Sequence, residues 1–286
     1  MNSDKSMRRR GVYLLPNLLT SAALFAGFYS IIAGINGKFE DAAIAIIVAG
    51  LLDGLDGRVA RLTNTQSDFG EQYDSLADLI SFGLAPALLA FNWSLSSLSD
   101  ISVFAGKIGW LAAFLFVACA ALRLARFNTQ VGIADKRYFQ GLASPAAAGT
   151  LVFTIWFFVA NDVAGPSVRW LIFFEIIVLA ILMFSRVRYY SFKAGPSGDK
   201  VPVWWVFLAV LIIVLLALDP PVMGMIFGSA YVLSGLFITI AGRRDWKLKR
   251  EKRPARHASE ALPDGDDAAN VEFSDDDGSD SDKPSD

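Results

Sequence analysis

Four aspartates in the first third of the chain stand at spacings that could gather their carboxylates in one place: Asp53, Asp56, Asp74 and Asp78. The first two are three residues apart and the last two are four residues apart, so on α-helices each pair lies on one face. The polar stretch 62–69 between the pairs is long enough to reverse the chain. Two antiparallel helices would then present their carboxylates to each other.

Such a cluster predicts a site for a hard divalent cation. Carboxylate oxygens and water are the ligands that Mg²⁺ and Mn²⁺ prefer, and no His or Cys lies near the aspartates to suggest zinc or a redox metal. Two ions that share carboxylates can stabilise both the attacking and the leaving oxygen in a displacement at phosphorus. We therefore expect one or two ions of Mg²⁺ or Mn²⁺ here, and chemistry at a phosphate group.

Small residues beside the aspartates favour a bulky ligand at this site. Gly57 and Ala60 follow Asp56 on the same helical face, and Gly70 lies one turn before the second pair. Residues with little or no side chain let a ligand approach the backbone closely. Arg61, on the same helical face as Asp53 and Asp56, could pair with a phosphate group of that ligand.

Composition places the carboxylates in a membrane protein. Hydrophobic residues make up 54% of the 286 residues, and the mean hydropathy of +0.44 is too high for an ordinary soluble domain. An Asp at the bilayer centre costs about 2.5–3.5 kcal/mol on insertion scales, so the cluster needs cations or water around it. We predict an all-α, polytopic transmembrane helical bundle of about eight spans, at residues 12–34, 41–61, 72–93, 103–126, 143–161, 167–185, 202–218 and 222–241.

Basic residues predict the orientation of these spans. Lys and Arg gather at the N-terminus, at the ends of the even-numbered predicted helices and in the stretch 243–256. Because cytoplasmic loops are enriched in these residues, we expect both termini and the mouth of the site to be cytoplasmic, in a multi-pass protein of the cell (inner) membrane. The first apolar stretch has full spanning length and no small-residue cleavage pattern, so no cleaved signal peptide is expected. The single cysteine, Cys119, rules out a disulfide framework.

The chain divides by composition into four parts. A basic N-terminus, 1–11, precedes a transmembrane catalytic domain, 12–242, whose core motif is 53–78. A basic juxtamembrane segment, 243–257, is expected to contact anionic lipid head groups rather than nucleic acid. The tail 258–286 holds eleven acidic residues and one Lys, a composition typical of disorder.

The spacing Asp-x2-Asp-Gly-x2-Ala-Arg-x8-Gly-x3-Asp-x3-Asp over 53–78 resembles, at all eight positions, the signature of the CDP-alcohol phosphatidyltransferases. Members of that family are integral membrane enzymes, usually homodimers, that transfer a phosphatidyl group from a CDP-linked lipid to an alcohol and release CMP. The resemblance implies that the four aspartates bind two divalent ions and that Asp78 is the catalytic general base. It also implies that the CDP-lipid site is lined by Gly57, Ala60, Arg61 and Ser67.

Blocks around the signature are similar to one branch of this family, the bacterial membrane-integral phosphatidylserine synthases: 16–20, 74–86, 121–128, 139–149 and 185–192. The glycerol-phosphate branch typically has Pro and Lys after its last two aspartates, where this chain has Ser75 and Leu79. The resemblance therefore implies CDP-diacylglycerol and L-serine as substrates. Membrane lipids and a second copy of the chain are the other expected partners.

Four polar residues outside the signature are further candidates for substrate contacts. The carboxylate of an amino-acid acceptor needs a cation, which Arg123 and Arg126 could supply, with anchoring at the cytoplasmic surface as their alternative role. Asn17 and Thr20, in the first predicted helix, could contribute to the CDP-lipid site. Their alternative role is hydrogen bonding between helices.

Two other functions stay open at this point. A sister enzyme would use the same chemistry on glycerol 3-phosphate, inositol phosphate or choline, and an extra cationic cluster for a phosphorylated acceptor would distinguish it. A cation transporter would use the aspartates as a transit site. Transporters commonly contain paired repeats, but the sequence holds no second copy of the acidic block.

Overall fold

The computed structural model describes residues 2–63, 65, 67–129, 138–185, 187–190 and 203–251. Its elements in chain order are α1 (Asn2–Ile35), α2 (Phe39–Leu62), α3 (Asp68–Asp78), η1 (Leu79–Leu84), α4 (Ala85–Trp93), η2 (Leu95–Asp100), α5 (Val103–Thr129), β1 (Tyr138–Gln140), α6 (Ser144–Ala160), η3 (Gly165–Val168), α7 (Arg169–Phe184), β2 (Arg188–Tyr190), α8 (Val203–Leu218) and α9 (Pro220–Glu251). The segment η1 is a π-helix, whereas η2 and η3 are 3₁₀-helices. Residues 1–241 form one compact unit, and α9 ends in a second.

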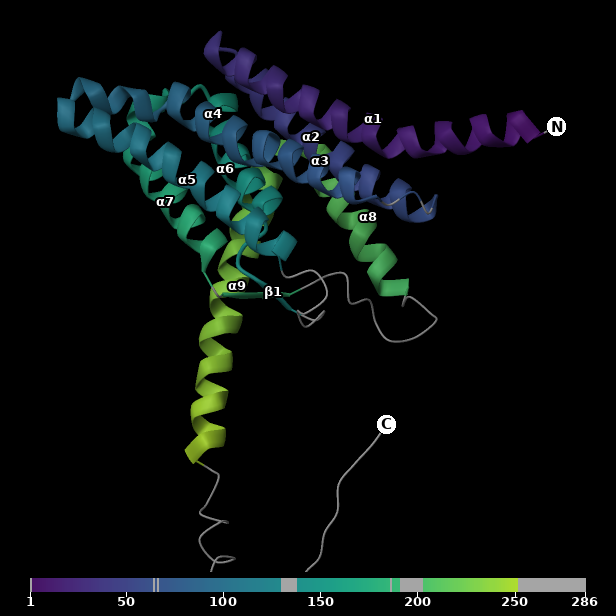
Figure 1. Ribbon diagram of the computed structural model, residues 1–286. Helices are drawn as coiled ribbons and strands as arrows, with labels where there is room; N and C mark the ends of the chain where they lie inside the picture. The colour runs from purple at the N-terminus through teal and green to yellow at the C-terminus, as the bar shows by residue number, and fades with distance from the viewer. Residues whose placement is uncertain are drawn as a thin grey trace, which may run out of the picture. The chain divides into compact units, whose positions relative to one another are not determined.

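Helices occur at all eight predicted positions, with most ends within a few residues of those expected (Figure 1). The helical character of the fold is therefore confirmed. The main differences are that α1 begins at Asn2, that η1 interrupts the predicted helix 72–93, and that β1 and β2 form a short antiparallel pair in which Tyr138 lies opposite Tyr190. The predicted acidic tail, 258–286, lies outside the described residues.

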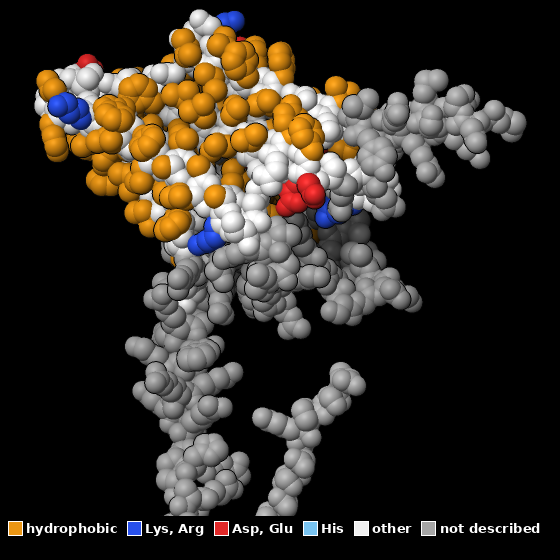
Figure 2. Space-filling model, in the orientation of Figure 1, with side chains coloured by type: hydrophobic (Ala, Val, Ile, Leu, Met, Phe, Trp, Pro, Cys, Tyr) orange, Lys and Arg blue, Asp and Glu red, His pale blue; other side chains and the backbone are white. Residues whose placement is uncertain are grey.

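Four of the described helical segments are long and apolar enough to cross a membrane: Leu15–Ile35, Asp68–Trp93, Val103–Thr129 and Gly165–Phe184. Helix α2, which carries charged residues of the signature, is not among them. Figure 2 shows apolar side chains over most of the described surface on one face of the molecule, and Phe25, Phe104 and Phe174 are each more than half exposed. A surface this apolar fits the hydrocarbon of a bilayer, so the chain is a membrane protein. The number of spans stays a prediction.

Helix α1 holds the two aspartate-bearing helices side by side. It packs against α2 along much of its length and also against α3. Helix α2 in turn contacts α4 and α6, and small buried residues such as Ala42, Ala43 and Ala49 allow the backbones to approach closely. Helix α5 packs against α7 and α4. The acidic helices are thereby fixed relative to each other through a third helix.

The π-helical segment η1 begins immediately after Asp78. The hydroxyl of Ser81, in η1, donates a hydrogen bond to the carbonyl oxygen of Ala23 in α1, with 3.2 Å between the oxygens. Gly27 of α1 makes room for this contact, because a Cβ there would lie only 2.5 Å from Ser81 Oγ. Single π-helical turns are frequent at functional sites. Here the hydrogen bond holds the turn against α1, directly after Asp78.

Candidate active site

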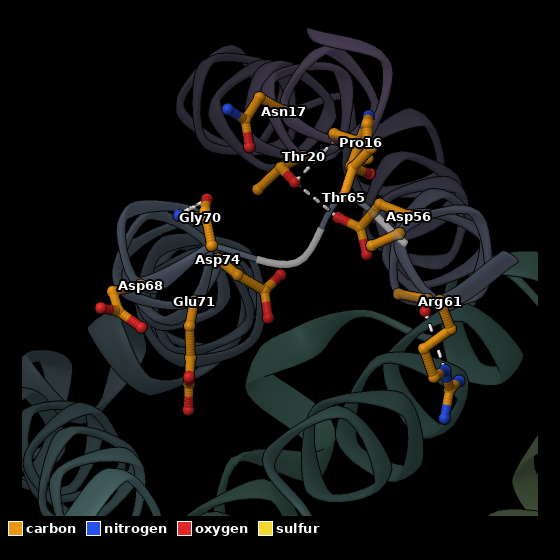
Figure 3. Close-up of a pocket in the computed structure, with 13 residues that line it drawn as sticks. Pro16, Asn17, Thr20, Asp56, Arg61, Thr65, Asp68, Gly70, Glu71 and Asp74 are labelled. Atoms are coloured by element: carbon orange, nitrogen blue, oxygen red, sulfur yellow. Dashed lines mark hydrogen bonds between the residues drawn. The ribbon is translucent and has the colours of Figure 1, made fainter. Parts of the chain in front are cut away.

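Carboxylates from α2 and α3 meet beside α1. Oxygens of Asp53, Asp56 and Asp74 all lie within 4.8 Å of one another. Figure 3 shows Asp56 and Asp74 reaching toward the same space from their two helices. Asp78, one turn further along α3, lies close enough to Asp53 and Asp74 for their charges to act on it. The structure thus brings together Asp53, Asp56 and Asp74, three of the four aspartates that were singled out by their spacing, and Asp78 lies near them.

Thr20 connects α1 to this cluster. Its hydroxyl donates a hydrogen bond to Asp56, with 2.7 Å between Oγ1 and Oδ2, and the carbonyl oxygen of Pro16 lies 3.1 Å away as an alternative acceptor. Thr20 and Asp56 are both buried. Thr20 therefore forms a hydrogen bond between two helices, which was the alternative role expected for it. The acceptor of this bond is a carboxylate of the cluster.

A pocket of about 520 Å³ opens beside the carboxylates (Figure 3). Its walls come from α1, α2, α3 and the turn between the last two, and they consist of Pro16, Asn17, Thr20, Asp56, Gly57, Ala60, Arg61, Thr65, Ser67, Asp68, Gly70, Glu71 and Asp74. All six residues predicted for the CDP-lipid site are among them. The volume lies within the range of typical small-molecule sites.

Two glycines of the signature shape the pocket in different ways. A Cβ on Gly57 would meet no heavy atom within 4 Å, so this position leaves open space at the wall. A Cβ on Gly70 would lie 3.2 Å from Ser67 Oγ and 3.4 Å from Asn17 Oδ1. Gly57 therefore keeps room for a ligand, whereas Gly70 lets the first turn of α3 approach α1.

Ser67 and Arg61 lie at the polar edge of the pocket. Ser67 is the N-cap of α3, and its Oγ accepts a hydrogen bond from the backbone N–H of Gly70 at 3.1 Å. Arg61 is exposed, and its Nε donates to the carbonyl oxygen of Gly57 at 2.9 Å. In Figure 3 the guanidinium group of Arg61 extends away from Asp56 and Asp74. Arg61 therefore supplies a cation at the rim rather than among the carboxylates.

The two candidate acceptor arginines have different surroundings although both belong to α5. Arg123 donates from Nη1 to the hydroxyl of Ser144 at 3.0 Å, and the charges of Arg123 and Asp78 act on each other. Arg126 donates from Nη1 to the carbonyl oxygen of Phe184 at 3.3 Å, and its guanidinium lies 5.9 Å from the centre of the Phe184 ring. Arg123 thus lies near Asp78, whereas Arg126 contacts the end of α7.

The donor set fits a hard divalent cation. Oδ1 of Asp74 is buried and accepts no hydrogen bond from the residues that the structure describes. Neighbouring carboxylates repel one another unless a cation or a proton lies among them. Oxygen ligands without sulfur or imidazole suit Mg²⁺ or Mn²⁺ rather than zinc. The cluster could therefore bind a metal ion of this class.

The structure also places residues in the pocket that sequence reasoning missed. Pro16, Thr65, Asp68 and Glu71 line it, and Thr65 is buried although it belongs to the turn between α2 and α3. Helical periodicity cannot give the path of a turn. A signal was nevertheless present, because Ser67 followed by two acidic residues in the next turn is typical of a helix N-terminus.

Known proteins resemble this chain over most of its length. The sequence profile of the CDP-alcohol phosphatidyltransferase family matches residues 13–184. A CDP-diacylglycerol–serine O-phosphatidyltransferase of Helicobacter pylori is 36% identical over 79% of this chain and 90% of its own length. An enzyme of the same name from Mycobacterium leprae is 32% identical over 64% of this chain and 60% of its own. An archaetidylserine synthase of Methanothermobacter thermautotrophicus is 35% identical over 61% and 69%, respectively.

The matched region includes the whole of the carboxylate cluster and every residue of the pocket. It also includes α2 to α7 and the apolar part of α1, and so most of the compact unit. The profile covers more than half of the chain, and the Helicobacter relative exceeds 30% identity over more than two thirds of it. The chain therefore belongs to the CDP-alcohol phosphatidyltransferase family.

Proposed function

We propose that this protein transfers the phosphatidyl group of CDP-diacylglycerol to the hydroxyl of L-serine, which gives phosphatidylserine and CMP. The observation that carries the proposal is the cluster of Asp53, Asp56 and Asp74 beside a pocket of about 520 Å³. Relatives that are named for a serine-using transfer support serine as the acceptor. The apolar surface of the helices supports a lipid substrate, because its acyl chains can stay in the bilayer.

The CDP head group is proposed to occupy the pocket between α1, α2 and α3. Gly57 leaves space for it against the backbone of α2. Arg61 at the rim can pair with a phosphate, and Asn17 and Ser67 are further polar residues that line the pocket. Ala60 keeps the wall between Gly57 and the rim free of a large side chain.

We propose that the four aspartates hold Mg²⁺ or Mn²⁺, with two ions bound. When bound, such ions neutralise charge on the diphosphate and make CMP a better leaving group. Thr20 keeps the carboxylate of Asp56 in one orientation through its hydrogen bond. The metal site thus depends on α1 as well as on the two helices that carry its ligands.

Asp78 is proposed to activate the acceptor. The hydroxyl of serine is a weak nucleophile at neutral pH and needs a base within hydrogen-bonding distance. Asp78 would take the hydroxyl proton while the serine oxygen forms a bond to the phosphatidyl phosphorus and the bond from that phosphorus to CMP breaks. Arg123, close to Asp78, would pair with the serine carboxylate. The geometry favours Arg123 over Arg126 for this role, because Arg126 contacts Phe184.

The arrangement in the membrane belongs to the same proposal. We infer eight spans with both termini and the pocket mouth on the cytoplasmic side of the cell membrane, supported by the distribution of Lys and Arg. The division into 1–11, 12–242, 243–257 and 258–286 and the assembly into a homodimer are kept as expectations. Protease accessibility in oriented vesicles and light scattering of the purified protein would test them.

The decisive experiment measures CMP release by the purified full-length protein in detergent–lipid micelles that contain CDP-diacylglycerol and Mg²⁺ or Mn²⁺. Serine, glycerol 3-phosphate, inositol phosphate and choline are added separately. We expect release of CMP and formation of phosphatidylserine only with serine, and EDTA should abolish both. Release with another acceptor alone would reject serine, and no release with any acceptor by folded protein would overturn the proposed transferase.

A further inference from the structure

Arg123 is held by a residue that lies outside the signature. Its Nη1 donates to the hydroxyl of Ser144 at 3.0 Å. Ser144 is the first residue of α6 and is fully buried. A hydrogen bond to a charged guanidinium group is stronger than one between neutral groups, and the rigid fork of the guanidinium makes it directional. This bond therefore restricts the orientation of the Arg123 side chain.

The chain just before α6 fixes the position of Ser144. Gly141 adopts a φ of +86°, and a Cβ there would collide with the carbonyl oxygen of Met183. The backbone N–H of Leu142 donates to the carbonyl oxygen of Leu182 at 3.0 Å. This turn is consequently tied to the end of α7. The backbone at Ser144 is therefore held in place by its neighbours. A residue that orients another side chain needs a backbone that is fixed in this way.

Arg123 interacts both with Ser144 and with the acidic side of the site. The charge of Asp78 acts on its guanidinium group, and so does the phenol of Tyr231 from α9. A guanidinium group carries five N–H donors in one plane, of which Ser144 engages one nitrogen. The bond to Ser144 thus determines which donors are presented on the side of Asp78.

We propose that Ser144 is a positioning residue that aims Arg123 at the carboxylate of the acceptor serine beside Asp78. The inference rests on the proposed function and adds a residue outside the signature to the acceptor site. Ser144 touches neither substrate nor the reacting atoms in this role. Its loss should therefore weaken the capture of serine and leave the binding of CDP-diacylglycerol unchanged.

The test compares steady-state kinetics of the full-length wild-type protein and Ser144→Ala in the same micelles. We expect the KM for serine to rise roughly tenfold, as for the loss of one hydrogen bond to a charged group, with the KM for CDP-diacylglycerol unchanged. Ser144→Thr, which keeps the hydroxyl, should recover most of the loss. The matched control is Thr150→Val on the same helix, because among the described residues the Thr150 hydroxyl donates only to the carbonyl oxygen of Ala146.

The outcomes separate the inference from the function on which it rests. Wild-type protein without serine-dependent CMP release would overturn the proposed function. An active Ser144→Ala protein with an unchanged KM for serine, or with both KM values raised alike, would overturn only the positioning role. If the alanine variant does not fold, Ser144→Cys tests the inference instead. Cysteine is similar in size to serine, but its sulfur is only a weak hydrogen-bond acceptor. This variant should raise the KM for serine by a smaller factor, and an unchanged KM would reject the inference.

Discussion

The hydroxyl of Thr20 on α1 donates a hydrogen bond to the carboxylate of Asp56 on α2 across 2.7 Å. This hydrogen bond connects Asp56, a candidate metal ligand, to α1, which contributes no aspartate to the cluster. Thr20→Val keeps the size of the side chain but removes the donor. We expect the metal concentration for half-maximal activity to rise roughly 10–100-fold, as for other residues that orient a metal ligand.

A serine on the same helix is a suitable control for this substitution. Ser30 is buried, and its Oγ has no hydrogen-bond partner among the described residues. Ser30→Ala should therefore leave the metal dependence unchanged. Titration of Mg²⁺ or Mn²⁺ into both variants measures the difference, and equal metal dependence of the two proteins would contradict the role of Thr20.

Asp78→Asn should remove the proposed base while preserving the fold. The substitution keeps the shape of the side chain, so we expect CDP-diacylglycerol still to bind. Transfer should fall by roughly 10²–10⁴-fold, the contribution of a general base. Asp41→Asn, on an exposed residue in the first turn of α2 that does not line the pocket, is the control and should stay active. Full turnover of Asp78→Asn would exclude Asp78 as the base.

Gly57→Leu should fill the pocket without disturbing the packing of the helices. A side chain at Gly57 meets no heavy atom within 4 Å of its Cβ, so the protein should fold with a melting temperature no lower than that of the wild type. The KM for CDP-diacylglycerol should rise at least roughly tenfold, because the added side chain occupies the ligand's volume. Gly149→Leu, also at an open position but on α6, should leave that KM unchanged.

Arg61→Ala should weaken the binding of CDP-diacylglycerol more than it lowers kcat. Arg61 lies at the pocket rim, where it can pair with a phosphate. Arg58 is an exposed arginine on the same helix that does not line the pocket, so Arg58→Ala is the matched control. Initial rates measured at varied concentrations of CDP-diacylglycerol give the KM for this substrate. If both variants have the KM of the wild type, Arg61 does not contact CDP-diacylglycerol.

Gly165→Ala should destabilise the protein without affecting the site. Gly165 is buried, and a Cβ there would collide with the carbonyl oxygen of Trp93. The hydroxyl of Ser94 also donates to the carbonyl oxygen of Gly165 at 2.8 Å, which limits any movement. We expect a loss of about 1–3 kcal/mol in the free energy of unfolding, as for overpacking in a core. Thermal unfolding measures it, and Gly149→Ala, at an open position, should unfold as the wild type does.

Local patterns in the sequence determined the helices and the residues of the acidic motif. Apolar runs and helical spacing depend on residues that are near one another in the chain, so the eight helices could be predicted with most of their ends. The same spacing placed Asp53 with Asp56 and Asp74 with Asp78 on common faces. The number of helices that cross the membrane is not determined in this way, because charged residues lower the hydropathy of α2.

Tertiary packing alone decided which side chains meet across helices. Arg123 and Arg126 are one turn apart on α5, yet one contacts Ser144 near the acidic cluster and the other contacts Phe184. The bond from Thr20 to Asp56 likewise joins residues 36 positions apart. Such contacts depend on how helices cross, and helical periodicity contains no information on this. The sequence by itself therefore determined the chemistry of the site, whereas the packing of α1, α5 and α6 decided how its groups are oriented.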